Sequence, residues 1–146
     1  MKPRRESGNW RPEGEVHRLA EGEPLPEWVA RLDRLVFGEA WDGLSSQEAL
    51  WVIPEVAFAR WSRVPAAGEA ELLRIAVTPE AQGQGLGRVL LEACQRDLAA
   101  EGLAHLFLEV RPTNDSALRL YEACGWELCG RRHRYYTNGE DALLFQ

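Results

Sequence analysis

Three glycines at alternate positions are the first sign of chemistry in this 146-residue sequence. They lie in Gln82-Gly83-Gln84-Gly85-Leu86-Gly87, between an apolar segment and a stretch with helical periodicity. Glycine lacks Cβ and tolerates positive φ, so several backbone N–H groups can converge on one anion at the start of a helix. Arg88 adds a positive charge beside them. The spacing favours a phosphate-binding loop over the alternative, a flexible turn.

Two well-known nucleotide-binding loops do not fit this spacing. A P-loop needs Gly-Lys-Ser/Thr after its glycines, and that ending is absent. A dinucleotide-binding fold could use Glu109, 22 residues after Gly87, as its ribose-binding acid. Its third glycine should follow the second by three positions, however, whereas Gly87 follows Gly85 by two. The chain is also too short for both halves of such a fold.

Glu109 is a second residue that could do chemistry. Alternation within the apolar run 106–110 places it on one strand face together with Phe107. A carboxylate in such a strand costs free energy unless it is paired or used. Glu109 is therefore a candidate functional residue, and the alternative is a strand-end acid that reaches solvent or Arg111.

Periodicity predicts the elements that would position these residues. A polar segment, expected to be flexible, covers 1–14, and one domain covers 15–146. We expect strands at 15–20, 56–61, 70–77, 105–110 and from 126, helices at 26–37, 87–100 and 115–124, and a closing hairpin of 131–136 with 142–145. Ser45 or Ser46 could cap another short helix, and 50–53 is at most a stub of strand because Pro54 stops it. Interleaved strands and helices indicate an α/β (α+β) fold around a mixed sheet.

Composition and charge narrow the functional classes. The chain is 45% hydrophobic and has no apolar run long enough to cross a bilayer. Its basic start lacks the apolar stretch of a signal peptide, so we expect a cytoplasmic protein without a membrane partner. A net charge of −6 disfavours nucleic acid and mildly favours a cationic partner, and a solvated acidic surface explains it equally well. Cys94, Cys124 and Cys129 show no metal-ligand spacing, so we expect reduced thiols and no metal.

The glycine loop and its surroundings resemble a known family. Gln82 to Gly87 after Ile75-Ala76-Val77 is similar to the Gln/Arg-x-x-Gly-x-Gly/Ala motif of the GCN5-related N-acetyltransferases, the GNAT family. The runs Leu108-Glu109-Val110-Arg111-Pro112-Thr113-Asn114 and Leu120-Tyr121-Glu122, followed by 131–136, resemble its bacterial ribosomal-protein alanine N-acetyltransferase branch. This resemblance covers about 71–145, half of the chain, and before it only the layout is similar.

The resemblance implies a fold and a co-substrate. The implied fold is a single-domain GNAT fold, a mixed and mostly antiparallel central sheet flanked by helices, whose central strands splay apart to hold acetyl-CoA. Val77 would lie nearest to the thioester, the glycine loop would wrap the pyrophosphate, and Asn114 would hydrogen-bond the cofactor arm. The implied cofactor-binding residues are Ile75, Ala76, Val77, Gln82, Gly83, Gln84, Gly85, Leu86, Gly87, Arg88 and Asn114.

The resemblance also implies a catalytic pair. Glu109 matches the family's general base, and Tyr121 matches the general acid that faces the coenzyme sulfur. An amine nucleophile must lose a proton, and an α-ammonium with a pKa of about 7.7–8.0 is within reach of a carboxylate. A lysine side chain with a pKa of about 10.4 is harder to deprotonate, which favours chain N-termini as acceptors. A tyrosine on an amphipathic helix is by itself more often a core residue, but the surrounding match favours catalysis.

The acceptor side of the site is matched less closely. Tyr135 and Tyr136 fall on the expected closing hairpin, where they could bond the acceptor backbone or pack across strands. Trp41 lies in a segment that loosely resembles the family's acceptor loop, and 50–60 lacks the usual hairpin turn, which predicts a shortened or displaced second strand. Three functions stay open: acetylation of a protein or peptide N-terminus, for example of a ribosomal protein, by a monomer or weak dimer; acetylation of a small-molecule amine; and non-catalytic acyl-CoA binding.

Overall fold

A seven-stranded sheet runs through the part of the chain that the computed structural model describes, residues 16–19 and 22–146. Its strand order is β1-β2-β3-β4-β5-β7-β6, and each neighbouring pair is antiparallel except β4 and β5, which are parallel. The strands are β1 (His17–Arg18), β2 (Glu48–Ile53), β3 (Ala57–Val64), β4 (Glu69–Val77), β5 (His105–Val110), β6 (Leu128–Arg132) and β7 (Ala142–Phe145). The helices are α1 (Glu27–Phe37), α2 (Leu86–Ala100) and α3 (Asp115–Ala123), with short 3-10 turns at Pro65–Ala67 and Pro79–Ala81. The predicted mixed, mostly antiparallel sheet flanked by helices is confirmed.

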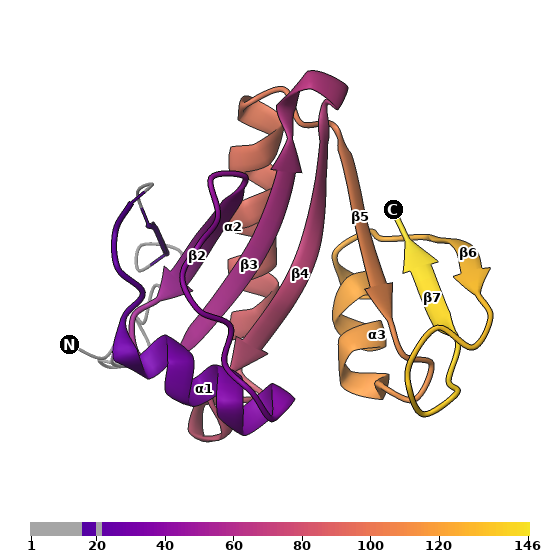
Figure 1. Cartoon of the computed structure of the whole chain (residues 1–146), viewed down its shortest axis with the longest axis horizontal. Helices are drawn as coiled ribbons and strands as arrows, with labels where there is room; N and C mark the ends of the chain where they lie inside the picture. The colour runs from indigo at the N-terminus through magenta and orange to yellow at the C-terminus, as the bar shows by residue number, and fades with distance from the viewer. Residues whose placement is uncertain (1–15, 20–21) are drawn as a thin grey trace.

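Helices cover the two faces of this sheet over separate apolar cores (Figure 1). Side chains on β2 alternate, so Trp51 joins the core on the α2 side whereas Leu50 and Val52 join the core on the α1 side. α2 presents Leu86, Leu90, Leu91, Cys94 and Leu98 to its core at helical spacing. Within the described ranges, no helix combines the length and the apolarity needed to span a bilayer. Residues of β2, β3 and β4 contribute to both cores, so these three strands are packed on both faces.

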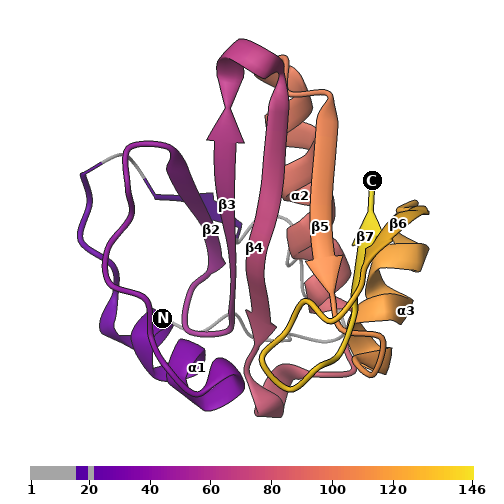
Figure 2. The same ribbon diagram turned by 45° about the vertical axis from the view of Figure 1, so that its right-hand side comes forward.

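β4 and β5 lie side by side at one end and separate at the other (Figure 1, Figure 2). Their paired register runs from Glu69 with His105 to Leu72 with Leu108, and the last five residues of β4 have no partner in β5. A bulge helps to bend β4 there, because Arg60 pairs with Arg74 and Trp61 with Leu72, which leaves Leu73 as an extra residue. The splayed central strands that were predicted are therefore present.

Most of the expected elements are confirmed. The segments 70–77, 87–100, 105–110 and 115–124 correspond closely to β4, α2, β5 and α3, and β6 with β7 forms the closing hairpin. Within the predicted first strand, β1 contains only His17 and Arg18. The N-terminal segment 1–14 lies outside the described residues.

Three local predictions are wrong. β2 is not a stub, shortened or displaced: it has six residues, all paired with β3, and it lies between β1 and β3. Glu55 adopts a positive φ of 61° and so closes the β2–β3 turn that the sequence did not reveal. No short helix begins at Ser45 or Ser46, because the chain turns there and enters β2 at Glu48.

The third correction concerns the closing hairpin. Tyr135 and Tyr136 lie in the loop that joins β6 to β7 and not on a strand, since β6 ends at Arg132. Arg134 has a positive φ of 50°, which takes the backbone out of extended geometry. The sequence run 131–136 resembles a strand in its side chains, but its backbone turns after two residues.

A buried ion pair fastens α1 to the sheet. Asp33 of α1 is 3% exposed, and its Oδ1 accepts a hydrogen bond of 2.7 Å from Nη1 of Arg74 on β4. Removing one partner of a buried pair leaves an uncompensated charge, which is much more costly than losing an exposed pair.

We expect the substitution Asp33→Ala to lower the free energy of unfolding by about 3–5 kcal/mol, because it removes the carboxylate partner of the Arg74 guanidinium, whose side chain is only 10% exposed. Urea unfolding followed by circular dichroism measures this change. Glu27→Gln is the control: it breaks an exposed i,i+4 pair with Arg31 and should cost less than about 0.5 kcal/mol. Equal effects of the two substitutions would show that the Asp33–Arg74 pair does not anchor the helix.

Candidate active site

The opening between β4 and β5 supplies the frame of the site. Ile75, Ala76 and Val77 form the free end of β4, where the strand pairs with β3 on one side and has no β5 partner on the other. Backbone N–H and C=O groups on such an edge need other partners. An extended ligand that carries amide groups could provide them, in the way that a further strand would.

The glycine loop joins this end of β4 to the start of α2, and its glycines have two different roles. Gly83 and Gly85 have φ values of +80° and +78°, the left-handed conformation that favours glycine. Gly87 is helical, and a Cβ at this position would lie 3.4 Å from Cδ2 of Leu120 and 3.8 Å from Cγ2 of Val77. The first two glycines therefore shape the loop, and the third allows α2, α3 and β4 to pack closely.

Gln82 contributes through its side chain. Its Nε2 donates a hydrogen bond of 3.0 Å to the carbonyl oxygen of Val77, which ties the loop back onto β4. Gly85 is the N-terminal cap of α2, and the first N–H groups of a helix have no intrahelical acceptor. The exposed Arg88 side chain lies nearby in the first turn, 3.5 Å from Glu92. This helix start has the properties of an anion-binding site.

Glu109 lies on β5 directly after the last residue that pairs with β4. Its side chain is 19% exposed, and its Oε1 lies 3.6 Å from Nε of Arg132. Its Oε2 is buried and has no hydrogen-bond partner among the described residues. An unsatisfied buried carboxylate oxygen is costly and requires an explanation, and a ligand N–H group would supply the missing donor.

Two tyrosine hydroxyls near the site have raised pKa values, and one of them responds to the charge of Glu109. Burial, and then the negative charge of Glu109, raise the pKa of Tyr136 above its usual value. Burial, followed by the influence of Tyr136, raises the pKa of Tyr121 still more strongly. Tyr121 is 6% exposed and packs its ring against Trp126 and Phe145, with centroids 6.2 and 6.4 Å away. Its phenol is protonated at neutral pH and has a proton to donate.

Asn114 is the N-terminal cap of α3. Its Oδ1 accepts hydrogen bonds from the Ala117 N–H at 3.2 Å and from the Ser116 hydroxyl at 3.3 Å. Capping occupies the carbonyl oxygen and leaves the Nδ2 group as the part of this exposed side chain that could reach a ligand.

The β6–β7 loop is fastened to the end of β5. The Arg111 guanidinium lies 3.9 Å from the ring centroid of Tyr136 and donates to Glu140 Oε1 at 3.1 Å. Hydrogen bonds from Asn138, Thr113 and Arg111 lower the pKa of Glu140. Tyr136 is thus held against Arg111, whereas Tyr135 is 51% exposed and stacks edge-on against Tyr136.

Trp41 lies on a different wall of the site. Its ring centroid is 3.5 Å from Cζ of Arg74, and its backbone N–H donates to Asp33 Oδ2 at 2.9 Å. It therefore belongs to the α1 side of β4, while Tyr135 and Tyr136 belong to the β5 side. The structure places the predicted acceptor residues on opposite walls and not in one cluster.

A cavity of about 350 Å³ lies beside Glu109, on the sheet face opposite α2. Its lining includes Glu71 and Arg132, which the sequence prediction missed. Burial, and then the charge of Glu109, raise the pKa of Glu71, which shows that the two carboxylates share this space. A sequence signal for Glu71 was available. Glu69 and Glu71 alternate with Ala70 and Leu72, and two acids on one face of a central strand are unusual.

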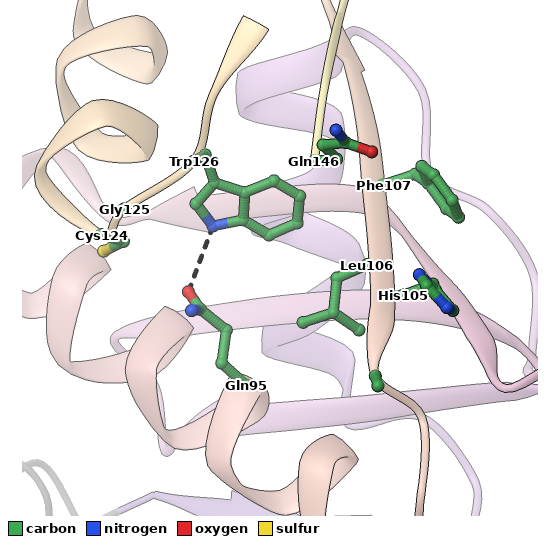
Figure 3. A pocket seen from close by; sticks show the side chains of 9 residues that line it. Gln95, His105, Leu106, Phe107, Cys124, Gly125, Trp126 and Gln146 are labelled. Atoms are coloured by element: carbon green, nitrogen blue, oxygen red, sulfur yellow. Dashed lines mark hydrogen bonds between the residues drawn. The ribbon is translucent and has the colours of Figure 1, made fainter. Parts of the chain in front are cut away.

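A larger cavity, of about 450 Å³, does not contain the predicted residues. Figure 3 shows Trp126 and Leu106 facing it, and Nε1 of Trp126 donates to Oε1 of Gln95 at 3.1 Å. His105 and Phe107 extend from the other side of β5 in the same view. This space lies beside the paired half of β5, away from the opening, so its size does not make it the reactive site. In the described part of the chain, no group of three or more His, Cys, Asp or Glu side chains is arranged to hold a metal ion.

A parallel strand pair that separates beside a glycine-rich helix start, with a carboxylate at the point of separation, is the arrangement expected of an α/β protein of the acetyltransferase type. The comparisons with known proteins agree. The model of the Acetyltransferase (GNAT) family matches residues 15–126, and the chain belongs to this family.

Individual relatives point in the same direction. The [ribosomal protein bS18]-alanine N-acetyltransferase of Escherichia coli (strain K12) is 48% identical over 79 residues, 52% of this chain and 53% of that protein. The chain thus spans about half the length of the curated relatives it matches. The crystal structure of the ribosomal-protein-S18-alanine N-acetyltransferase from Escherichia coli is similar over 89% of this chain and 90% of that one, with 31% identity and a TM-score of 0.74. A GNAT family acetyltransferase from Elizabethkingia anophelis with acetyl-CoA bound shares the fold, with 19% identity, 89% and 94% coverage and a TM-score of 0.68.

We expect Gly85→Ala to destabilise the protein by about 1–2 kcal/mol and to weaken coenzyme A binding, because a Cβ penalises the left-handed conformation that shapes the loop. Urea unfolding and calorimetric titration with coenzyme A measure the two effects. Gly102→Ala serves as the control: it introduces the same backbone strain, at a φ of +84°, beyond the other end of α2, so it should destabilise the protein without changing coenzyme A affinity. Unchanged coenzyme A affinity in Gly85→Ala would argue against phosphate binding by this loop.

Proposed function

We propose that this chain is an acetyl-CoA-dependent N-acetyltransferase that modifies the α-amino group of a protein or peptide N-terminus. The observation that carries the proposal is the buried Oε2 of Glu109, which has no hydrogen-bond donor within the described ranges and lies where β4 and β5 separate. The bS18-alanine N-acetyltransferases among its relatives support a protein acceptor. A ribosomal protein is therefore the first acceptor class to test.

The residues present suit acetyl-CoA as co-substrate. The free edge of Ile75–Val77 would bind its amide-rich arm, the 82–88 loop its pyrophosphate, and the Asn114 side chain a polar group of the arm. Acetyl-CoA supplies an activated acetyl group and a thiolate leaving group. No covalent enzyme intermediate is needed, and none of the three cysteines has a part in the reaction.

The catalytic roles follow from charge and protonation. Glu109 accepts a proton from the acceptor ammonium, directly or through a water, which frees the nitrogen lone pair to attack. Tyr121 holds a proton for the departing sulfur, and its raised pKa keeps the phenol protonated at neutral pH. The charge of Glu109 contributes to the raised pKa of Tyr136, and Tyr136 contributes to the raised pKa of Tyr121. The Tyr136 hydroxyl could hydrogen-bond the acceptor backbone.

We expect Glu109→Gln and Tyr121→Phe each to lower kcat by about 10²–10⁴-fold, because each removes one proton transfer. Acetyl-CoA affinity should change little. The measurement is thiol release with peptides that vary in their first residue, and Cys129→Ser, at an exposed thiol, is the control that should retain full activity. Full turnover by both variants would instead indicate a non-catalytic acyl-CoA-binding module. Turnover confined to diamines or amino acids would indicate a small-molecule acetyltransferase.

The pH dependence provides a separate test. Activity should rise with pH as the acceptor ammonium, with a pKa of about 7.7–8.0, becomes easier to deprotonate. Since the pKa of Tyr121 is raised, its proton is retained beyond the usual tyrosine range, and no decline should occur between about pH 8 and pH 10. A profile of kcat/KM on a stable peptide checks both limbs. A decline below pH 9 that Tyr121→Phe abolishes would contradict the assigned donor state.

A further inference from the structure

The Asp33–Arg74 pair does more than join α1 to the sheet, because both of its members also contact Trp41. Asp33 divides its two oxygens: Oδ1 accepts from Arg74 at 2.7 Å, and Oδ2 accepts from the Trp41 backbone N–H at 2.9 Å. The guanidinium of Arg74 lies 3.5 Å from the Trp41 ring centroid. One buried carboxylate therefore fixes the backbone of Trp41 and the cation on which its ring stacks.

Arg74 has further partners at and just after the end of α1. It lies 4.6 Å from the Phe37 ring centroid, and its Nη1 also donates to the Glu39 carbonyl oxygen at 3.0 Å. A planar guanidinium can stack on rings and donate in fixed directions at once, which an ammonium group cannot do. Since Arg74, with 10% side-chain exposure, cannot move freely, the segment 37–41 is fastened to β4 and not merely adjacent to it.

The position of this cluster on β4 matters for the reaction. Arg74 follows the bulge at Leu73 and immediately precedes Ile75, so it lies where β4 has already separated from β5. The C-terminal end of α1 lies beside this end of β4 in both views (Figure 1, Figure 2). Pairing with Arg60 puts Arg74 on the sheet face that is opposite α2 and that also carries Glu71 and Glu109. Trp41, stacked on Arg74, therefore lies on the same sheet face as Glu109, at the open end of β4 and outside the lining of the 350 Å³ cavity.

We propose that Arg74 and Asp33 are positioning residues that hold Trp41 against the first residues of the acceptor peptide. Acceptor binding then depends on the stacked geometry of Arg74 and not only on its charge. We expect acetyl-CoA affinity to change little, because the Arg74 side chain lies on the sheet face opposite α2, the helix that the glycine loop enters. The inference rests on the proposed peptide acetyltransferase activity.

The test compares Trp41→Ala, Arg74→Lys and the double variant in steady-state kinetics with an alanine-initiated peptide and acetyl-CoA. Arg74→Lys keeps the positive charge beside Asp33 but removes the planar stacking surface. We expect each single variant to raise the peptide KM about five- to tenfold with kcat and acetyl-CoA affinity nearly unchanged. The double variant should be no worse than Trp41→Ala, because Arg74 acts through Trp41.

Arg18→Lys is the matched control. Arg18 is also an ion-paired arginine stacked on a tryptophan, with its Cζ 4.5 Å from the Trp51 centroid and its guanidinium paired with Glu101, but it lies on β1 at the other edge of the sheet. Its peptide KM should equal that of the unsubstituted protein. A second variant, Asp33→Leu with Arg74→Leu, removes both buried charges together and so limits the loss of stability. It should show the same rise in peptide KM.

The outcomes separate the two proposals. If the unsubstituted protein acetylates no peptide, the proposed function fails, and this inference fails with it. If peptides are acetylated but Arg74→Lys leaves their KM unchanged, the proposed function stands and the positioning role is wrong. Multiplicative effects of Arg74→Lys and Trp41→Ala, or an equal loss of acetyl-CoA affinity, would also overturn it, because either result indicates a general structural role.

Discussion

The separation of β4 from β5 is the constraint on which the site depends. Backbone polar groups in a sheet are normally satisfied by the neighbouring strand, and the end of β4 gives up that neighbour after Leu72. The free-energy cost of the unpaired backbone groups is limited, because β4 stays paired with β3 as far as Val77 and the Gln82 side chain donates a hydrogen bond to the Val77 carbonyl oxygen. The free edge therefore persists in a folded protein and remains available to a ligand.

The other parts of the site are placed by this separation. β4 delivers the chain into the glycine loop at the open end, so that the start of α2 faces the same gap as the free strand edge. β5 places Glu109 directly after its last contact with β4. The glycine loop and the proposed base are thus 21 residues apart in sequence, from Arg88 to Glu109, and lie at the same opening.

The two faces of the sheet have different physical characters. The face on the α2 side is apolar, and the Trp61 ring there packs against both Trp51 and Trp126. The opposite face combines apolar packing beneath α1 with buried charges, among them Asp33 and Arg60. Buried charges of this kind contribute little net stability when paired, and they are best explained by the geometry they impose. In the Asp33–Arg74 pair, that geometry fixes the segment 37–41 against β4.

The sequence by itself determined the elements whose signals are local. Alternation identified β4 and β5, helical spacing identified α2 and α3, and the three glycines identified the loop between β4 and α2. Only the tertiary structure decided the rest, because those features depend on partners that are distant in the chain. The full length of β2 required its pairing with β3, and the loop conformation of Tyr136 depends on Arg111 and Glu140. Asp33 and Arg74 are 41 residues apart, and no sequence pattern connects them. Their pairing becomes necessary only when folding removes both charges from water, because a buried charge without a partner is costly.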